Sequence, residues 1–239
     1  MNDYRYNQLD REMPLAYGFG GVLAADASVA ARMAFIRKVY ALFLGGIFSA
    51  MAGVAVSIVT GLYMAVVQYY WLALILLIGA VFGVGAVRRV KGVNLVALFA
   101  FTFFEGVLIS PIILFTLGRS PLALLGAGAL TVATFGGLTA YTFITRKDFS
   151  FLSGFLFTGL IVILVASLIG IFVGSSVFSL AISSGAVLLF AGYVLYDTSN
   201  IVHSLPTDEY VAGALSLFLD FFGLFIHLLN ILNILGGDE

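Results

Sequence analysis

Long apolar stretches recur along almost the whole of this 239-residue sequence, and they constrain its fold more than any other feature. A helix needs about 20 consecutive, mainly apolar residues to cross the hydrocarbon core of a bilayer. Seven segments meet that requirement, at residues 39–61, 66–87, 94–116, 121–144, 151–174, 177–202 and 212–235. They predict an all-α membrane protein in the form of a seven-transmembrane-helix bundle.

The amino-acid composition also indicates that most of the chain lies in lipid. Hydrophobic residues make up 62% and charged residues 10% of the sequence, and the mean hydropathy is +1.14. Soluble domains, by contrast, are about half apolar and about a quarter charged. The net charge of −1 gives no footprint for nucleic acid, and the lack of cysteine excludes disulfides and thiolate metal sites. The expected partner is therefore the lipid bilayer and not a nucleic acid.

The basic residues are distributed unevenly between the two ends of the predicted helices. Ten of the eleven Lys and Arg residues lie before the first segment, between the second and third, or between the fourth and fifth. Arg119 is the exception and lies at the opposite end. The positive-inside rule therefore places the N-terminus in the cytoplasm and, with seven spans, the C-terminus outside.

Residues 1–32 are mixed in polarity and lack a sustained apolar face. We interpret them as a flexible cytoplasmic tail, and residues 33–239 as a single seven-helix transmembrane domain. A cleaved signal peptide is the alternative, because residues 15–25 are weakly apolar and end in small residues. Acidic residues such as Asp3, Asp10 and Glu12 argue against that alternative.

Two pairs of glycines inside the apolar segments are four residues apart. They are Gly79 with Gly83 and Gly170 with Gly174. This spacing lets two helix backbones approach closely. We expect the glycines to support packing within the bundle rather than a dimer interface.

Three acidic residues remain at membrane depth once the loops are set aside: Glu105, Asp197 and Asp220. An ionised carboxylate near a helix centre costs about 2.5–3.5 kcal/mol on insertion scales, and such residues normally face the bundle interior or water. Each is therefore a candidate functional residue. The alternative for each is a protonated or hydrogen-bonded carboxyl group that only ties helices together.

Asp197 and Asp220 lie at similar depth on consecutive segments, each about 8–12 Å inside the predicted cytoplasmic boundary. Consecutive helices joined by a short loop usually pack side by side, so the two carboxyl groups can meet. At ~4 Å and an effective dielectric of ~20, two carboxylates repel each other by about 4 kcal/mol. The pair should then hold one shared proton and titrate as a unit. Such a pair is suited to sensing pH or to contacting a cation such as Ca²⁺.

Other polar residues extend this pair along the two segments. Asn200 shares the helical face of Asp197, and His227 lies two turns beyond Asp220. Both are candidates for an ion or proton pathway. For His227 the alternative is a buried structural histidine.

Glu105 and Arg88 each allow two interpretations. Glu105 is either a further cation-binding step along a pathway or a protonated tether between helices. Arg88 ends the second segment, where its side chain can extend to the membrane surface. It either anchors the topology or reaches inward to pair with Asp197.

Several segments resemble those of a known family. Residues 192–198 (GYVLYDT) and 214–229 (ALSLFLDFFGLFIHLL) resemble the two signature segments of the Bax inhibitor-1 family, in its bacterial branch of transmembrane Bax inhibitor motif-containing proteins. Residues 101–111 are similar to the third helix of that family, and residues 146–150 to its loop between helices 4 and 5. The resemblance covers roughly residues 35–236.

The resemblance implies a fold and a function for the bundle. It implies a central helix enclosed by the others, and a pH-sensitive calcium leak across the membrane. Together with the charge asymmetry, the bacterial branch gives a bacterial inner membrane with a periplasmic C-terminus. By the same resemblance Asp197 and Asp220 form a proton-sensing pair, and Arg88 is a latch that holds the closed state on Asp197. The sequence departs from the family pattern at Glu105, where a small residue is common, and at Gly223, where asparagine is frequent.

The functional hypothesis is therefore a pH-sensitive calcium leak channel that passes calcium ions, needs no cofactor and responds to protons. The alternative is a non-transporting membrane protein that regulates a partner protease or secretion complex, with the aspartates as packing elements. An enzyme is not predicted. Neither aspartate lies in the Gly-x-Gly-Asp pattern of intramembrane aspartyl proteases, and two histidines alone do not make a zinc site.

Overall fold

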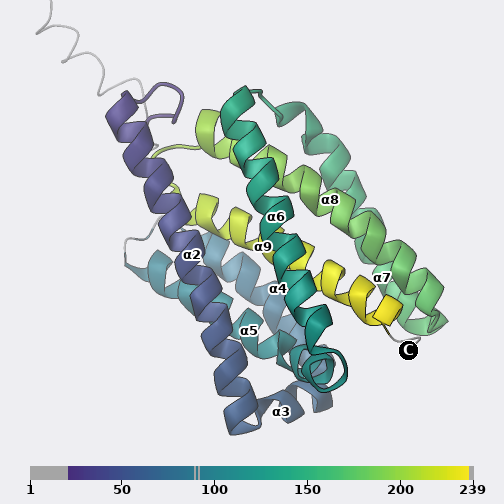
Figure 1. Ribbon diagram of the computed structural model, residues 1–239. Helices are drawn as coiled ribbons and strands as arrows, with labels where there is room; N and C mark the ends of the chain where they lie inside the picture. The colour runs from purple at the N-terminus through teal and green to yellow at the C-terminus, as the bar shows by residue number, and fades with distance from the viewer. Residues whose placement is uncertain (1–20, 89, 91, 237–239) are drawn as a thin grey trace, which may run out of the picture.

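The computed structural model describes residues 21–88, 90 and 92–236, and this part of the chain contains seven helices long and apolar enough to span a membrane. They are α2 (Val29–Thr60), α4 (Tyr70–Val87), α5 (Val93–Arg119), α6 (Pro121–Thr145), α7 (Ser153–Val173), α8 (Ser176–His203) and α9 (Tyr210–Leu235) (Figure 1). A short helix, α3 (Leu62–Gln68), precedes α4, and a 3₁₀ turn, η2 (Ser150–Leu152), precedes α7. The described residues form no strand. The prediction of an all-α membrane protein with seven transmembrane helices is confirmed.

The first two spans differ from the predicted boundaries. Helix α2 begins at Val29 because the Ser28 side chain accepts a hydrogen bond from the Ala31 amide and caps the helix. It ends at Thr60 and is capped by Gly61, whose φ of 79° suits a residue without a side chain. The predicted second span from residue 66 is wrong at its start, because the chain breaks again at Tyr69. Residues 1–20 of the predicted tail, and the loop cations Arg89 and Lys91, lie outside the described residues.

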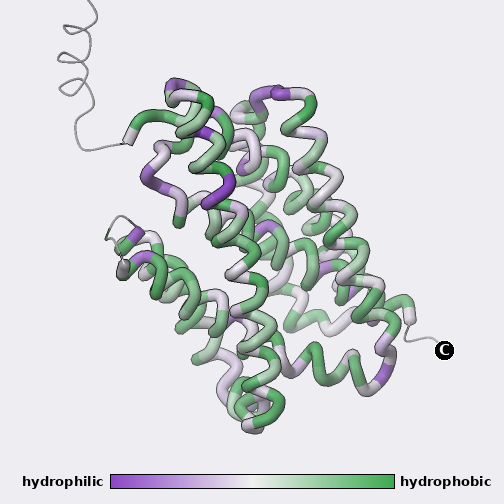
Figure 2. Tube along the Cα trace, turned by 60° about the vertical axis from the view of Figure 1, so that its left-hand side comes forward, coloured by the Kyte–Doolittle hydropathy of each residue, from purple (hydrophilic) through white to green (hydrophobic). Residues whose placement is uncertain are grey.

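Helix α9 is the central helix of the bundle. It packs against α2, α5, α6 and α8, which surround it in Figure 1. Helices α4 and α7 lie at the periphery, α4 mainly against α5 and α7 mainly against α8. Apolar residues dominate the trace of all these helices (Figure 2), as expected where the outer surface faces lipid. The expected enclosure of a central helix is therefore present.

The backbones of helices α2 and α5 approach each other closely at two glycines. A Cβ atom at Gly106 would collide with the backbone of Ala50, and one at Gly53 with the backbone of Phe103. The predicted role of Gly79 and Gly83 is wrong, since the space beside each is empty within 4 Å. Both of those glycines lie on peripheral α4.

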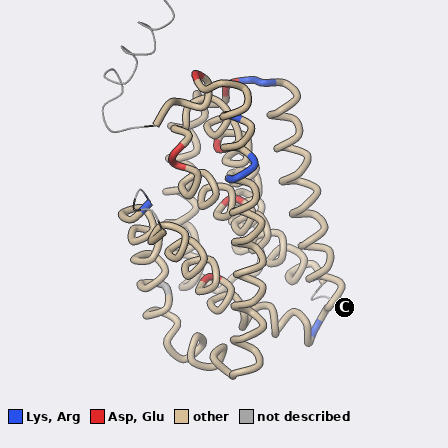
Figure 3. The backbone as a smooth tube through the Cα atoms, turned by 90° about the vertical axis from the view of Figure 1, so that its left-hand side faces the viewer, with Lys and Arg blue, Asp and Glu red and all other residues tan. Residues whose placement is uncertain are grey.

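One end of the bundle carries most of the charge, and we call it the charged end. It holds the loop between α8 and α9 and the loop after α6 (Figure 3). Helix α5 runs away from it and ends at Arg119, at the opposite end of the bundle. Residues 21–28 cover the α8–α9 loop: Leu23 pairs with Pro206, and the Ala24 amide donates to the Leu205 carbonyl at 3.0 Å. The segment before α2 is therefore fixed to the helices that carry the two aspartates.

Candidate functional site

The structure brings Asp197 of α8 and Asp220 of α9 together. Their helices run side by side from a short loop, and the two carboxyl groups lie within side-chain hydrogen-bonding reach of each other. Asp220 is only 3% exposed, while Asp197 is partly exposed. The side chains that the depth argument placed near each other are thus neighbours in the folded chain.

The chemistry of this pair follows from its surroundings. Two carboxyl oxygens can share a hydrogen bond only when one of them carries a proton. Arg88 forms an ion pair with Glu209, and among the described residues neither aspartate is paired with a cation. Full ionisation would place two like charges side by side in a medium of low dielectric. The arrangement therefore suits a pair that holds one proton between its two groups.

Hydroxyl groups from other helices lie around Asp220. The Tyr40 hydroxyl of α2, Thr139 Oγ1 of α6, Thr198 Oγ1 of α8 and Asp220 Oδ2 are buried, and none makes a hydrogen bond of normal geometry with the described residues. Thr139 and Thr198 lie within hydrogen-bonding reach of the Tyr40 hydroxyl, and Asp220 is near enough to interact with that hydroxyl electrostatically. Helices α2, α6, α8 and α9 therefore each contribute a polar atom to the same buried region. Sequence reasoning missed Tyr40 and Thr139, since single hydroxyl residues in an apolar helix are common.

Arg88 pairs with a different acid from the one expected. Its Nε lies 3.4 Å from Oε2 of Glu209, the residue that directly precedes α9. The expected ion pair between Arg88 and Asp197 is therefore not present in the structure. Arg88 follows the last residue of α4, and its side chain is 47% exposed. The guanidinium group can therefore bind an acid of the α8–α9 loop while it stays in contact with water. Sequence reasoning missed Glu209 because a loop acid carries no signal of burial, yet Glu209 is buried.

A second cation contacts the start of α9. The Lys38 Nζ atom of α2 lies 3.2 Å from the centre of the Tyr210 ring, which is a cation–π contact. Arg88 and Lys38 therefore bind neighbouring residues at the same helix start. Through them α4 and α2 are both connected to the helix that carries Asp220.

Glu105 lies apart from the aspartate pair. It is buried on α5, and the described chain provides it with neither a hydrogen bond nor an ion pair. A tether between helices would require such a bond, so the structure offers no support for that interpretation. Nor does any group of three or more His, Cys, Asp or Glu side chains gather around it or elsewhere in the described residues.

His227 belongs to a second polar cluster, on the far side of Phe190 from the aspartates. Its Nδ1 lies 3.4 Å from Ser183 Oγ, and Asn230 Nδ2 donates to the same oxygen at 2.8 Å. The Phe190 ring stacks on His227 with centroids 5.9 Å apart and fills the space beside Gly223. Because Gly223 lies between Asp220 and His227 on α9, this ring separates the two polar groups.

Asn200 is placed near the end of α8. Its carbonyl accepts the amides of Ser204 and Leu205, both at 2.8 Å, and so ends the helix before the α8–α9 loop. The half-buried side chain lies one turn nearer that loop than Asp197. In the structure Asn200 therefore helps to end the helix that carries Asp197.

A bound cation would find a limited set of oxygen ligands here. Ca²⁺ prefers six to eight oxygen ligands. The two carboxyl groups supply four oxygens, and the Tyr40 hydroxyl, with Thr139 and Thr198 beside it, is buried in the same region. Those residues fit a transient contact that water completes better than a closed protein cage.

Comparison with known proteins relates this geometry to a family. The family model described as inhibitor of apoptosis-promoting Bax1 matches residues 32–237. The chain is 35% identical to an uncharacterised protein of Campylobacter jejuni, over 94% of this chain and 96% of that protein. It is 34% identical to protein lifeguard 4 of Mus musculus, over 89% and 90%, and 33% identical to Bax inhibitor 1 of Schizosaccharomyces pombe, over 98% and 89%. The matched region contains Arg88, Asp197 and Asp220.

Proposed function

The chain belongs to the Bax inhibitor-1 family of multi-pass membrane proteins, and from this premise we propose that it is a pH-sensitive calcium leak channel. Asp197 and Asp220 are its proton sensor. The observation that carries the proposal is the close approach of these two carboxyl groups inside the bundle, where no described Lys or Arg forms an ion pair with either. Calcium ions and protons are the species on which the channel acts.

The energetic effect of losing the shared proton is large enough to move helices. Two carboxylates at ~4 Å and an effective dielectric of ~20 repel by about 4 kcal/mol. Such a free energy changes the ratio of two conformations by roughly a thousandfold. Deprotonation therefore favours an arrangement in which α8 and α9 separate near the pair.

The Arg88–Glu209 ion pair is the latch in this proposal. It joins the end of α4 to the start of α9, two helices that otherwise have little contact. A shift of α9 at Asp220 would be transmitted along one helix to Glu209, about three turns away. Arg88 thus keeps the latch role that the family resemblance implies, with Glu209 rather than Asp197 as its acid in this arrangement.

We further propose that the charged end faces the cytoplasm of a bacterial inner membrane. Arg37 and Lys38 lie near the start of α2 and Arg146 and Lys147 just after α6, toward that end, whereas Arg119 ends α5 at the other. Figure 3 shows most Lys and Arg positions toward the charged end. The positive-inside rule then places the C-terminus in the periplasm. In this orientation the aspartate pair lies nearer the cytoplasmic surface and responds to cytoplasmic pH.

A non-transporting regulatory protein is the second candidate. The relative from Schizosaccharomyces pombe is named Bax inhibitor 1, a name that describes action on another protein and not transport. In that case the aspartates serve only to pack α8 against α9. A membrane-protein partner, such as a protease or secretion complex, would then be the target.

Calcium flux into proteoliposomes at several pH values tests the proposal. Asp220→Asn should abolish the pH dependence, because a lone Asp197 has no second carboxyl group with which to share a proton. Asp148→Asn is the matched control: Asp148 is an exposed loop acid whose Oδ1 accepts the Ser150 amide at 2.8 Å. The sensor assignment is wrong if Asp220→Asn keeps the wild-type pH profile. Absence of flux at every pH in the wild type would favour the regulatory function.

A further inference from the structure

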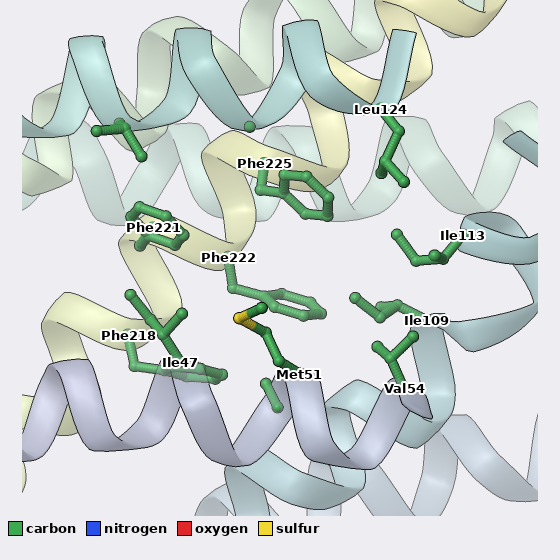
Figure 4. Close-up of a pocket in the computed structure, with 13 residues that line it drawn as sticks. Ile47, Met51, Val54, Ile109, Ile113, Leu124, Phe218, Phe221, Phe222 and Phe225 are labelled. Carbon is green, nitrogen blue, oxygen red and sulfur yellow. The ribbon is translucent and has the colours of Figure 1, made fainter. Parts of the chain in front are cut away.

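A large apolar pocket lies between four of the spanning helices. Its volume is about 480 Å³, and α2, α5, α6 and α9 each contribute to its walls (Figure 4). Met51, Ile109, Ile113, Leu124, Phe222 and Phe225 are among the lining residues. Every lining residue is apolar, so the pocket offers no hydrogen bond to a ligand.

The pocket exists because α2 and α6 come apart along the face of α9. Toward the charged end, aromatic residues join them: Phe43 stacks on Phe135 with centroids 5.0 Å apart, and Phe221 of α9 packs against both rings. Beyond this aromatic contact the two helices each pack on α9 but hardly on each other. In Figure 4 the phenylalanines of α9 project into the gap that results.

The open side of the pocket faces the bilayer. Met51 of α2 and Val132 of α6 line the pocket and are also exposed on the side of the bundle. At this position in a spanning helix the surrounding solvent is hydrocarbon. An apolar cavity of about 150 Å³ already stays dry and admits benzene. A pocket three times larger that opens sideways is therefore accessible to a lipid tail and unsuited to water.

We propose that this pocket binds an acyl chain of a membrane lipid, inserted sideways between α2 and α6. The chain lies against Phe218 and Phe221, which line the pocket and flank Asp220 on α9. Occupancy therefore restricts the turn of α9 that carries the proposed proton sensor. This last consequence rests on the proposed function, whereas the binding of the lipid does not.

The chain offers a matched pair of variants for testing the site. Gly128 lines the pocket, and a Cβ atom there would have nothing within 4 Å, so the side chain of Gly128→Phe starts in open space and should occupy the pocket. Gly137 is on the same helix and also has nothing within 4 Å, but it does not line the pocket. Nine residues separate the two, which turns Gly137 to the opposite face of α6. Gly137→Phe is therefore the control for a bulky residue on α6.

Photolabelling in bilayer nanodiscs tests the proposal. The probe is a phospholipid with a diazirine near the end of one acyl chain, and the labelled residues are identified by mass spectrometry. We expect labels on Ile113 and Phe225, although Ile113 is only 7% exposed. Labelling at both should fall several-fold in Gly128→Phe and stay at the wild-type level in Gly137→Phe. Phe172 of α7, which is 86% exposed, reports contact with bulk lipid and should be labelled equally in all three proteins.

Three results would overturn the proposal. The first is labelling confined to outward residues such as Phe172, with none inside the pocket. The second is equal labelling of Ile113 in wild type and Gly128→Phe. The third is a cross-link from a pocket residue to a second copy of the chain, which would assign this face to an oligomer. None of these readouts depends on calcium flux, so a failure of the leak hypothesis leaves this test intact.

Discussion

The carboxyl group of Asp220 lies beside that of Asp197 and near the Tyr40 hydroxyl, and among the described residues no cation forms an ion pair with it. Tyr40 and Thr198 supply neutral dipoles, and Asp197 supplies the one partner able to carry a negative charge. Neutral dipoles adapt to either protonation state, because a hydroxyl both donates and accepts. A lysine or arginine in their place would fix the pair as ionised. The residues around Asp220 thus leave its protonation state free to change.

Thermal unfolding in detergent should reveal the repulsion within the pair. As the pH is raised and the shared proton is lost, the wild type should lose stability relative to Asp220→Asn, by at most about 4 kcal/mol. Asp197→Asn should give the same relief, and the double variant should give no more than either single one. A double-mutant cycle measures this non-additivity. Strictly additive effects at every pH would mean that the two carboxyl groups act independently.

The loop acid Asp148 gives a pH dependence of the opposite kind, outside the membrane spans. The backbone and side chain of Ser150 lower the pKa of Asp148 by hydrogen bonding to its carboxylate. Because the folded-state pKa is lowered, the turn is fully stabilised above the unfolded-state pKa and loses that contribution as the pH falls through the folded-state value. Exchange of the Ser150 amide, corrected for its intrinsic pH dependence, should therefore lose protection only in acid. Asp148→Asn should show no such acid transition.

Some residues of the site can be predicted from the sequence, and others cannot. Asp197 and Asp220 stand out because a charge inside an apolar segment is costly, and the rise per residue gives their depth. Glu209 and Tyr40 do not stand out, since a loop acid and a tyrosine in a helix are unremarkable. Their role depends on which helices meet. That information lies in the tertiary packing and not in any local pattern.

At the scale of the elements, α4 is held to the rest of the bundle weakly at its charged end. The Arg88–Glu209 ion pair joins it to α9, but the arginine is 47% exposed. Ion pairs in contact with water contribute about 0.2–1 kcal/mol. A contact of that strength breaks readily, which suits an element that must move.

A double-mutant cycle on Arg88→Ala and Glu209→Gln checks this estimate. We expect a coupling free energy of unfolding below about 1 kcal/mol. In flux assays both single variants should raise the basal calcium leak, and the double variant should raise it no further. If Glu209→Gln leaves the leak at the wild-type level while Arg88→Ala raises it, the acid partner of Arg88 in the latch is another residue.

The contact between α2 and α5 is rigid by comparison. Gly106→Ala would place a methyl group against the backbone of Ala50, which cannot move aside like a side chain. Overpacking of this kind typically costs 1–3 kcal/mol, and we expect about that loss in stability to thermal unfolding. Gly79→Ala on α4 is the control, because its methyl group would enter empty space. Equal stability of the two variants would show that α2 and α5 separate easily.

The sequence predicts the spanning elements well and their contacts poorly. Apolar length alone identifies all seven spans, because every helix must cross the same hydrocarbon thickness. It misses the break at Tyr69, where no charged residue marks the end of α3. It also selects Gly79 and Gly83 instead of Gly53 and Gly106, since spacing does not show whether another helix lies opposite.

At the scale of the whole molecule, the enclosed position of α9 connects the separate features of this protein. Asp220 of the aspartate pair, the start of the helix at Glu209 and the phenylalanines of the apolar pocket all lie along this one helix. Peripheral α4 contacts it through an ion pair, and α2 and α6 contact it on either side of the pocket. A displacement of α9 would therefore change the contacts at the aspartate pair, at the Arg88–Glu209 ion pair and at the pocket. The direction of the pH response, however, depends on which end of α9 faces the cytoplasm.

Cysteine labelling determines that orientation directly, because the natural chain has no cysteine. Lys147→Cys introduces a thiol in the exposed loop after α6, and Gly118→Cys introduces one at the opposite end, where nothing lies within 4 Å. In intact bacterial cells with a permeable outer membrane, a maleimide that cannot cross the inner membrane should label Gly118→Cys and not Lys147→Cys. After lysis both should be labelled. The reverse pattern would place the charged end and the aspartate pair toward the periplasm, and the sensor would then respond to external pH.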